Sequence, residues 1–214
     1  MKQEKISEAV VRRLPTYLQL LHELDRRDVE TVSSQELGDL LGLNPAQIRK
    51  DLAYFGDFGR KGVGYDVQNL IGNIRNILKL NQTINVALVG TGNLGHALCN
   101  YNKYSRDNNL KIVAVFDQHP NKIGTQINNL TVQPMSELKQ TVEEQYIRIG
   151  IITVPDDAAQ SVANQFVEAG IEGILNFAPA VLKVPDEIRV HYADFTRELL
   201  SLAFYLENER SKTE

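Results

Sequence analysis

The sequence predicts an α/β protein in which a helical N-terminal domain precedes a doubly wound parallel sheet. Apolar residues recur at helical spacing through residues 1–80. From Ile84 onward, short β-branched runs alternate with helical patterns, which is the order of parallel βαβ units. We expect one domain over 1–80 and a second over 84–193, joined at Asn81-Gln82-Thr83, with a separate C-terminal helix within 194–214.

The composition is that of a globular protein. The chain has 214 residues, of which 43% are hydrophobic and 23% are charged, enough for one large domain or two smaller ones. No apolar run approaches the ~20 residues that a membrane span needs, and the charged segment Met1–Pro15 does not read as a secretory signal. The single cysteine, Cys99, excludes an intrachain disulfide and favours the reducing cytoplasm, but the sequence assigns it no role.

Two helix start signals lie close together in the N-terminal domain. Ser33 and Glu36 form a capping box that opens a short helix over 35–41. Asn44-Pro45 then supplies an N-cap and a proline at the first position of a second helix, which we expect to reach about Phe55. Two short helices joined by a tight turn are typical of a helix-turn-helix.

Longer helices are predicted on either side of this motif. Leucine and other apolar residues repeat at helical spacing over 9–24, where Pro15 either kinks the helix or opens a second one. Asp66 is placed to cap a further helix, whose apolar face runs to Ile77. We expect that helix to pack beneath the segment that precedes it.

The second helix of the motif carries a polar face suited to DNA. At 100° per residue, Ile48 and Leu52 point inward, and glutamine, lysine and small alanines lie opposite. These polar types reach base edges and phosphates. The alternative is a solvated face on an ordinary helical hairpin. The residues expected to contact DNA from this helix are Gln47, Arg49, Lys50 and Tyr54.

A basic, glycine-rich segment follows this helix. Phe58–Tyr65 alternates glycine with Arg60 and Lys61, which predicts a β-hairpin whose basic tip contacts phosphates or enters the minor groove. A helix-turn-helix followed by a basic hairpin is a winged helix, and this position argues against a plain surface turn. A local basic patch on a chain of net charge -4 favours selective DNA binding over indiscriminate coating.

The second domain contains a dinucleotide-binding fingerprint. Strands are expected over 84–90, 111–117, 147–154, 173–177 and 188–194, and helices over 94–104, 136–145 and 156–169. Gly-x-Gly-x-x-Gly follows the first strand and opens a helix, as in Rossmann folds, where the glycines permit a tight turn, approach of the pyrophosphate and close packing. Helix-start amides would hold the phosphates. The residues expected to contact the dinucleotide are Gly90, Thr91, Gly92, Asn93, Leu94 and Gly95.

The end of the second strand favours NADH or NAD⁺ as the ligand. Asp117 lies about 20 residues past the glycines, where a carboxylate accepts hydrogen bonds from the adenosine ribose. No arginine follows to receive a 2′-phosphate, and His119 and Lys122 are the nearest cationic candidates. NAD(H) is therefore favoured over NADP(H).

A proton donor or acceptor for dehydrogenase chemistry is not evident. The chain has 4 histidines. His96 follows the phosphate-binding glycines, where positive charge is disfavoured, His119 lies near the adenosine end, and His191 lies in a β-type run. No substrate-binding domain is evident. We therefore expect a protein that binds NADH without turning it over, with no catalytic residue and no metal site.

Four motifs occur in an order that is specific to one family. They are Arg12-Arg13-Leu14-Pro15, Arg49–Gly56, Gly62–Tyr65 and Ile174–Pro179. Together they resemble the Rex family of redox-sensing transcriptional repressors, over about Ile6 to Glu207. The resemblance implies a homodimer of winged-helix and Rossmann-type subunits, with the helix over about 195–210 swapped between them. It also implies repression of fermentation and respiration genes at inverted-repeat operators, with release by NADH, while NAD⁺ binds more weakly.

The same resemblance implies roles for three further positions. Tyr101 matches the tyrosine after the glycine motif, although the Asn102-Lys103-Tyr104 that follows departs from the Pro-Gly-Phe of many members. Arg13 and Asp194 match an arginine and an acidic residue linked to contacts that depend on the ligand state. The alternative for this pair is an interdomain ion pair without a switching role.

Two other functions remain open from the sequence. One is an NAD-dependent oxidoreductase with a helical N-terminal domain. The other is a nucleotide- or CoA-binding interaction module, since a Rossmann domain with an Asn-Phe-Ala-Pro loop suits either ligand.

Overall fold

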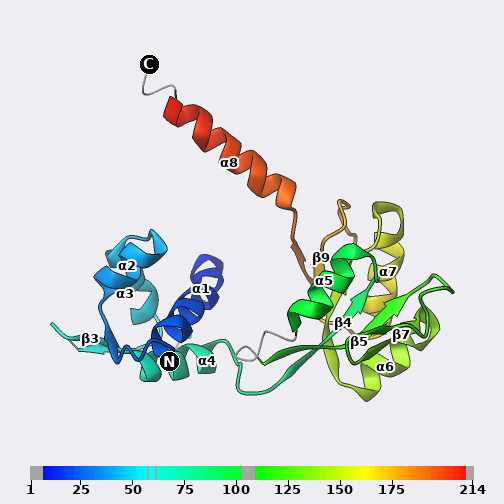
Figure 1. The fold of residues 1–214 in the computed structure, drawn as a ribbon, viewed down its shortest axis with the longest axis horizontal. Coiled ribbons are helices and arrows are strands. Elements are labelled where there is room, and N and C mark those ends of the chain that lie inside the picture. The colour runs from blue at the N-terminus through cyan, green and yellow to red at the C-terminus, as the bar shows by residue number, and fades with distance from the viewer. Residues whose placement is uncertain (1–6, 57, 61, 103–108, 211–214) are drawn as a thin grey trace. The chain divides into compact units, whose positions relative to one another are not determined.

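The structure is a computed structural model that describes residues 7–56, 58–60, 62–102 and 109–210. The chain divides into two compact units, Met1–Gln82 and Thr83–Glu214 (Figure 1). The predicted helices and strands are present in the predicted order, and three further strands were not predicted. The ends of the predicted elements differ by about one or two residues, as helix and strand limits commonly do.

The first unit is built on four helices. They are α1 (Glu8–Asp25), α2 (Ser34–Leu41), α3 (Pro45–Ala53) and α4 (Val67–Ile77). Pro15 lies inside α1, so it does not open a second helix. Leu14, Leu21 and Ile74 are fully buried, because the apolar faces of α1 and α4 pack together.

The helix caps are those expected from the sequence. Ser33 makes a complete capping box, Asn44 accepts from the backbone N–H of Ala46, and Asp66 accepts from that of Asn69. α3 ends at Ala53, two residues before the expected limit of about Phe55. The N–H of Phe55 bonds three residues back, to the Leu52 carbonyl, and this tighter turn ends the helix.

A small antiparallel sheet completes the winged helix. It contains β1 (Thr31–Val32), β2 (Gly59–Arg60) and β3 (Gly64–Asp66), in the order β1-β3-β2. Gly64 has φ +106, and a Cβ there would lie 2.6 Å from the Val32 carbonyl oxygen, so only glycine fits. The expected hairpin is thus β2–β3, and β1 is an additional strand.

The second unit is a seven-stranded sheet in the order β10-β9-β8-β4-β5-β7-β6, parallel except for the edge strand β6. The chain order reverses between β4 and β8. In doubly wound folds, ligands bind at the carboxyl ends of the strands on either side of such a reversal. The short hairpin β6–β7 was not expected. The strands are β4 (Ile84–Val89), β5 (Leu110–Asp117), β6 (Gln126–Ile127), β7 (Leu130–Pro134), β8 (Ile147–Ile152), β9 (Gly173–Asn176) and β10 (Arg189–Tyr192).

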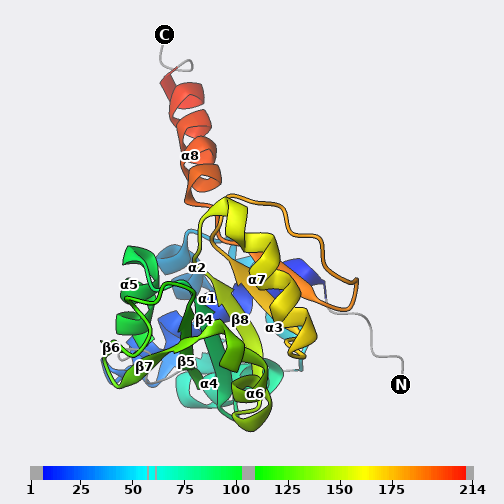
Figure 2. The same cartoon turned by 90° about the vertical axis from the view of Figure 1, so that its right-hand side faces the viewer.

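Helices cover both faces of this sheet (Figure 2). On one face, Ala87 and Val89 pack with α6 (Leu138–Glu144) and α7 (Asp156–Glu168). On the other, Val86 and Leu88 pack with α5 (Asn93–Asn102). This alternation follows from the two-residue period of a strand. The predicted helix over 136–145 is a short 3₁₀ helix, Met135–Glu137, followed by α6.

The last helix, α8 (Phe195–Arg210), exposes its apolar residues. So many exposed apolar side chains on one helix are typical of an interaction site. In the described ranges, neither α8 nor another helix has the length and apolarity needed to cross a membrane. The exposed apolar residues are Phe195, Leu199, Leu200, Leu202, Phe204, Tyr205 and Leu206.

The tight contact between β8 and α7 gives a stability prediction. A Cβ at Gly150 would lie 2.4 Å from the ring of Phe166, which is fully buried. Gly150→Ala is therefore expected to lower the free energy of unfolding by about 2 kcal/mol, the usual cost of overpacking a core. Urea unfolding followed by circular dichroism measures this change.

Gly173→Ala is the matched control, because its nearest neighbours would lie 3.8 Å from the new Cβ, which is an ordinary contact. This variant should stay within about 0.5 kcal/mol of the parent. Equal stabilities of the two variants would contradict the packing argument.

Candidate functional site

The glycine loop after β4 is held in a conformation that side chains would prevent. Gly90 has φ +102, and a Cβ there would lie 2.6 Å from the Thr153 carbonyl oxygen. A Cβ at Gly95 would lie 2.0 Å from the Gly90 carbonyl oxygen. At Gly92 a Cβ would meet nothing within 4 Å, so this glycine faces open space. The loop is closed against the protein at two glycines and open at the third.

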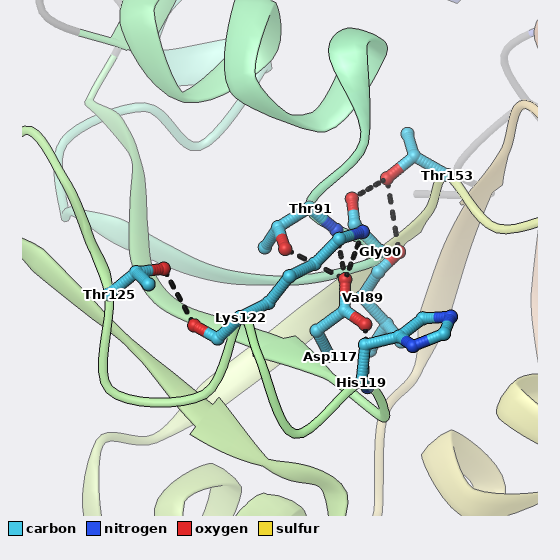
Figure 3. A network of polar contacts seen from close by, with 8 residues as sticks. All are labelled: Val89, Gly90, Thr91, Asp117, His119, Lys122, Thr125 and Thr153. Carbon is cyan, nitrogen blue, oxygen red and sulfur yellow. Dashed lines mark hydrogen bonds and ion pairs between the residues drawn. The ribbon is translucent and has the colours of Figure 1, made fainter.

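Thr153 fixes this loop from the neighbouring strand end, as Figure 3 shows. Its Oγ1 donates to the carbonyl oxygens of Val89 (3.0 Å) and Gly90 (2.7 Å). The sequence interpretation did not single out Thr153. Its position directly after β8 could have indicated it, because β8 pairs with β4 and both strands end at the same edge.

A cavity of about 550 Å³ lies against the loop. Small-molecule and cofactor sites commonly have volumes of roughly 300–1,000 Å³. Gly92 lines this cavity, and the space in front of it is open. A pyrophosphate could therefore approach the backbone there closely, as dinucleotide binding requires. The residues present therefore fit a dinucleotide. The lining includes Gly90, Gly92, Asn93, Leu94, Asp117, His119 and Lys122.

Asp117 lies at the end of β5 and collects several donors (Figure 3). Its Oδ2 accepts from the backbone N–H and the hydroxyl of Thr91, at 2.8 and 2.7 Å, and from Lys122 Nζ at 3.1 Å. Its Oδ1 accepts from the His119 N–H at 2.9 Å. Burial alone would raise the pKa of Asp117, but these donors more than offset it and hold the pKa well below its ordinary value. The group is a carboxylate at neutral pH.

The expected DNA-contacting side chains of the first unit are placed as follows. Lys50 is exposed on α3, and Arg49 is exposed and donates to Ser34 Oγ at 2.8 Å. Tyr54, which follows α3, is 42% exposed. Gln47 is only partly exposed, because its amide turns toward Asp51. Arg60 lies in β2, but its side chain is outside the described part of the chain, and so is Lys61 altogether.

Asp51 is a buried carboxylate that the sequence interpretation missed. Its side chain is 0% exposed. Arg13 donates to it twice, from Nε at 2.6 Å and from Nη2 at 2.8 Å, and the Tyr17 hydroxyl and Gln47 Nε2 each donate at 2.7 Å. Burial alone would raise the pKa of Asp51, but these donors reverse the effect and the pKa is lowered. The carboxylate thereby ties α1 to α3.

The proposed switch residues lie in different units. Arg13 belongs to α1 and pairs with Asp51. Asp194 Oδ1 accepts from the Thr196 N–H at 2.9 Å, at the start of α8. Tyr101 lies near the end of α5, and its side chain, like residues 103–108, is outside the described residues. The roles of these three residues stay predictions.

Within the described residues, no group of three or more His, Cys, Asp and Glu is arranged to hold a metal ion.

Two domain families match the two units. A family described as "Putative DNA-binding protein N-terminus" matches residues 5–53, and one described as "CoA binding domain" matches residues 81–180. The redox-sensing transcriptional repressor Rex of Brevibacillus brevis is 57% identical over 205 residues, 96% of this chain and 99% of that protein. This chain belongs to the Rex family of redox-sensing transcriptional repressors. Membership confirms the predicted repressor class, as opposed to an NAD-dependent oxidoreductase.

Solved structures of a Rex-family repressor, RSP, have the same fold over almost the whole chain. RSP in complex with β-NAD⁺ and operator DNA is 37% identical, with a TM-score of 0.88, and the match covers 98% of this chain and 96% of that one. RSP in complex with β-NADH is 35% identical, with a TM-score of 0.87 and 98% coverage of both chains. The Rex fold therefore spans both units.

The Asp51 contacts give a prediction for stability. Arg13→Met is expected to lower the free energy of unfolding of the first unit by about 3 kcal/mol, because it leaves a buried carboxylate without its cation. Thermal or urea unfolding measures the effect. Arg12→Met is the control, since Arg12 and Glu8 form an ion pair that is 62% and 80% exposed. It should change stability by no more than about 0.5 kcal/mol. Similar losses in both variants would contradict a special role for Asp51.

Proposed function

We propose that this protein is a transcriptional repressor that binds operator DNA as a homodimer and is released by NADH. It thereby reports the cytoplasmic NADH/NAD⁺ ratio to genes of fermentation and respiration. One observation carries the proposal: RSP, crystallised with both β-NAD⁺ and operator DNA, matches 98% of this chain. The winged helix and the nucleotide site described above are both within that match.

The winged helix supplies the DNA-binding surface in this proposal. The exposed side of α3 enters the major groove, where Gln47 reaches a base edge and Lys50 adds positive charge. Arg49 and Tyr54 lie at the margins of the helix, and the β2–β3 hairpin brings Arg60 and Lys61 to the phosphates. The inverted repeat of the operator would mirror the twofold symmetry of the dimer.

The nucleotide site holds the adenosine half of NADH. Gly92 and the amides that begin α5 face the pyrophosphate, and the Asp117 carboxylate accepts from the ribose hydroxyls. Tyr101 is proposed to lie near the nicotinamide end. No side chain is required to move a proton to or from the ligand, since sensing needs binding alone.

The contact between Lys122 and Asp117 favours NADH over NADPH. Asp117 is the carboxylate that is proposed to bind the ribose, and the ammonium group of Lys122 already pairs with its Oδ2. A 2′-phosphate placed here would meet the Asp117 charge, with Lys122 committed to that charge. Repulsion between the 2′-phosphate and the Asp117 carboxylate disfavours binding of NADPH.

Dimerisation is proposed to proceed through α8. Its exposed apolar residues need a covering surface, and a swap of this helix onto the second subunit supplies one. Two recognition helices that read successive major grooves must lie about 34 Å apart. A modest rotation between NADH-bound subunits is then enough to remove this match.

Arg13 and Asp194 are proposed to take part in that rotation. Each is held locally, Arg13 by Asp51 and Asp194 by the Thr196 N–H. A state-dependent contact between them would require at least Arg13 to exchange partners. Such an exchange gives the two conformations different hydrogen bonds, which is what a two-state switch requires.

The ribose contact gives a ligand-selectivity prediction. Asp117→Asn removes the repelling charge and releases Lys122, so the ratio of NADPH to NADH affinity is expected to rise roughly tenfold, equivalent to about 1.4 kcal/mol. Isothermal titration with each nucleotide measures the ratio. Thr125→Val is the control, since its hydroxyl donates to the Lys122 carbonyl and makes no contact with Asp117. An unchanged ratio in Asp117→Asn would contradict the proposed ribose contact.

Gel-shift titration tests the function as a whole. Duplexes selected by the protein from a randomised inverted repeat should be bound without nucleotide and with NAD⁺, and be released by NADH. Since coupling is reciprocal, saturating operator should weaken NADH binding by the same factor. Coenzyme A serves as the competitor control and should displace neither NADH nor DNA. Equal NADH affinities with and without operator would overturn the sensing proposal.

A further inference from the structure

The amide of Gln47 has a defined orientation in the first unit. Its nitrogen, Nε2, lies 2.7 Å from Asp51 Oδ1, one helical turn further along α3. A carboxylate accepts hydrogen bonds and cannot donate them. The NH₂ end of the amide must therefore face Asp51. The free ends of the Gln47 side chain are then the carbonyl oxygen and the second N–H.

Asp51 cannot turn to accommodate a flipped amide. Its carboxylate is fully buried, and the Arg13 guanidinium occupies both oxygens in a two-point contact at 2.6 and 2.8 Å. Tyr17 donates to Oδ2 at 2.7 Å from the next turn of α1. With Gln47, four donor groups hold the two oxygens of this carboxylate. The orientation of Asp51 is set by Arg13 and Tyr17 of α1, which packs behind α3.

We propose that Asp51 is a positioning residue that fixes the amide of Gln47 so that Gln47 reads adenine in the major groove. The carbonyl oxygen and remaining N–H of Gln47 form one acceptor and one donor. Adenine presents the complementary pair there, the N6 donor and the N7 acceptor. This inference rests on the proposed DNA-binding function and adds to it a base preference and the residue that sets it.

An unanchored glutamine would discriminate less. Its amide could present donor and acceptor in either order, and so match more than one base edge. Within the described residues, the side chains of Arg49 and Lys50 form no hydrogen bond to a buried group, unlike that of Gln47. Arg49 is held by Ser34 Oγ at the edge of α2, and Lys50 is an exposed point charge. Among the predicted reading residues of α3, the described contacts therefore fix Gln47 against the buried interior.

Asp51→Asn is the variant that tests the inference. The side chain keeps its shape, but its amide can donate to Gln47 Oε1 and so permits the flipped orientation. Duplexes are first selected by the parent protein from a randomised inverted repeat, and dissociation constants are then measured for every single-base change in one half-site. In the parent, one adenine should be preferred over the other bases by roughly tenfold or more, a preference that Gln47→Leu removes.

In Asp51→Asn the preference for that adenine should fall to about twofold or less, while preferences at other positions and the salt dependence of binding stay unchanged. Tyr17→Phe is the matched control, since it removes a hydrogen bond from the same carboxylate and leaves the Gln47 contact in place. It should retain the preference. A general weakening on all duplexes, with the adenine preference intact, would overturn the inference and leave Asp51 with a structural role.

Folding is checked by circular dichroism for each variant. If Asp51→Asn does not fold, the double variant Arg13→Met with Asp51→Asn replaces it, because removing both charges leaves none uncompensated. The same loss of preference is expected. Failure of the parent to bind any selected duplex would refute the proposed function itself. Binding by the parent with unchanged preferences in the Asp51 variants would refute this inference alone.

Discussion

The nucleotide site depends on one constraint, the parallel arrangement of β4, β5 and β8. Parallel strands end at a common edge, so the residues that follow them meet in space although they lie far apart in the sequence. Gly90 and Thr153 follow β4 and β8, and Asp117 is the last residue of β5. Side-by-side packing at the edge is so close that Gly90 and Gly95 have no room for a Cβ. The cavity of the candidate site lies against this edge.

The first unit uses a comparable constraint on a smaller scale. A single buried carboxylate, Asp51, links α3 to α1 through Arg13 and Tyr17. Breaking such a pair is costly because one charge remains buried. The geometry of the side of α3 that is proposed to face DNA is thus determined partly from behind the helix. Surface charge alone does not account for the position of Gln47.

Much of the fold could be predicted from the sequence because its signals are local. The Ser33 capping box, Asn44-Pro45 and the glycine fingerprint each act over a few residues. Helices α2, α3 and α5 begin at these signals, and β4 ends where the fingerprint begins. Thr153 and Asp51 could not be identified in the same way. Their partners are 63 and 38 residues away, so their roles exist only once the chain is folded. The helical pattern of α3 assigned inward positions to Ile48 and Leu52 but gave no reason to expect a charged residue there.

Hydrogen bonds from two threonines fix the conformation of the glycine loop after β4. Thr91 and Thr153 hold the loop in place before any ligand arrives, so little conformational entropy is lost there on binding. In the proposed function, the loop and Asp117 face the pyrophosphate and the adenosine ribose, which are chemically identical in NAD⁺ and NADH. A ligand shifts a conformational equilibrium only through its different affinities for the two states. The rigid end of the site therefore sets an affinity that both redox forms share, and the response to reduction must be generated at the nicotinamide end.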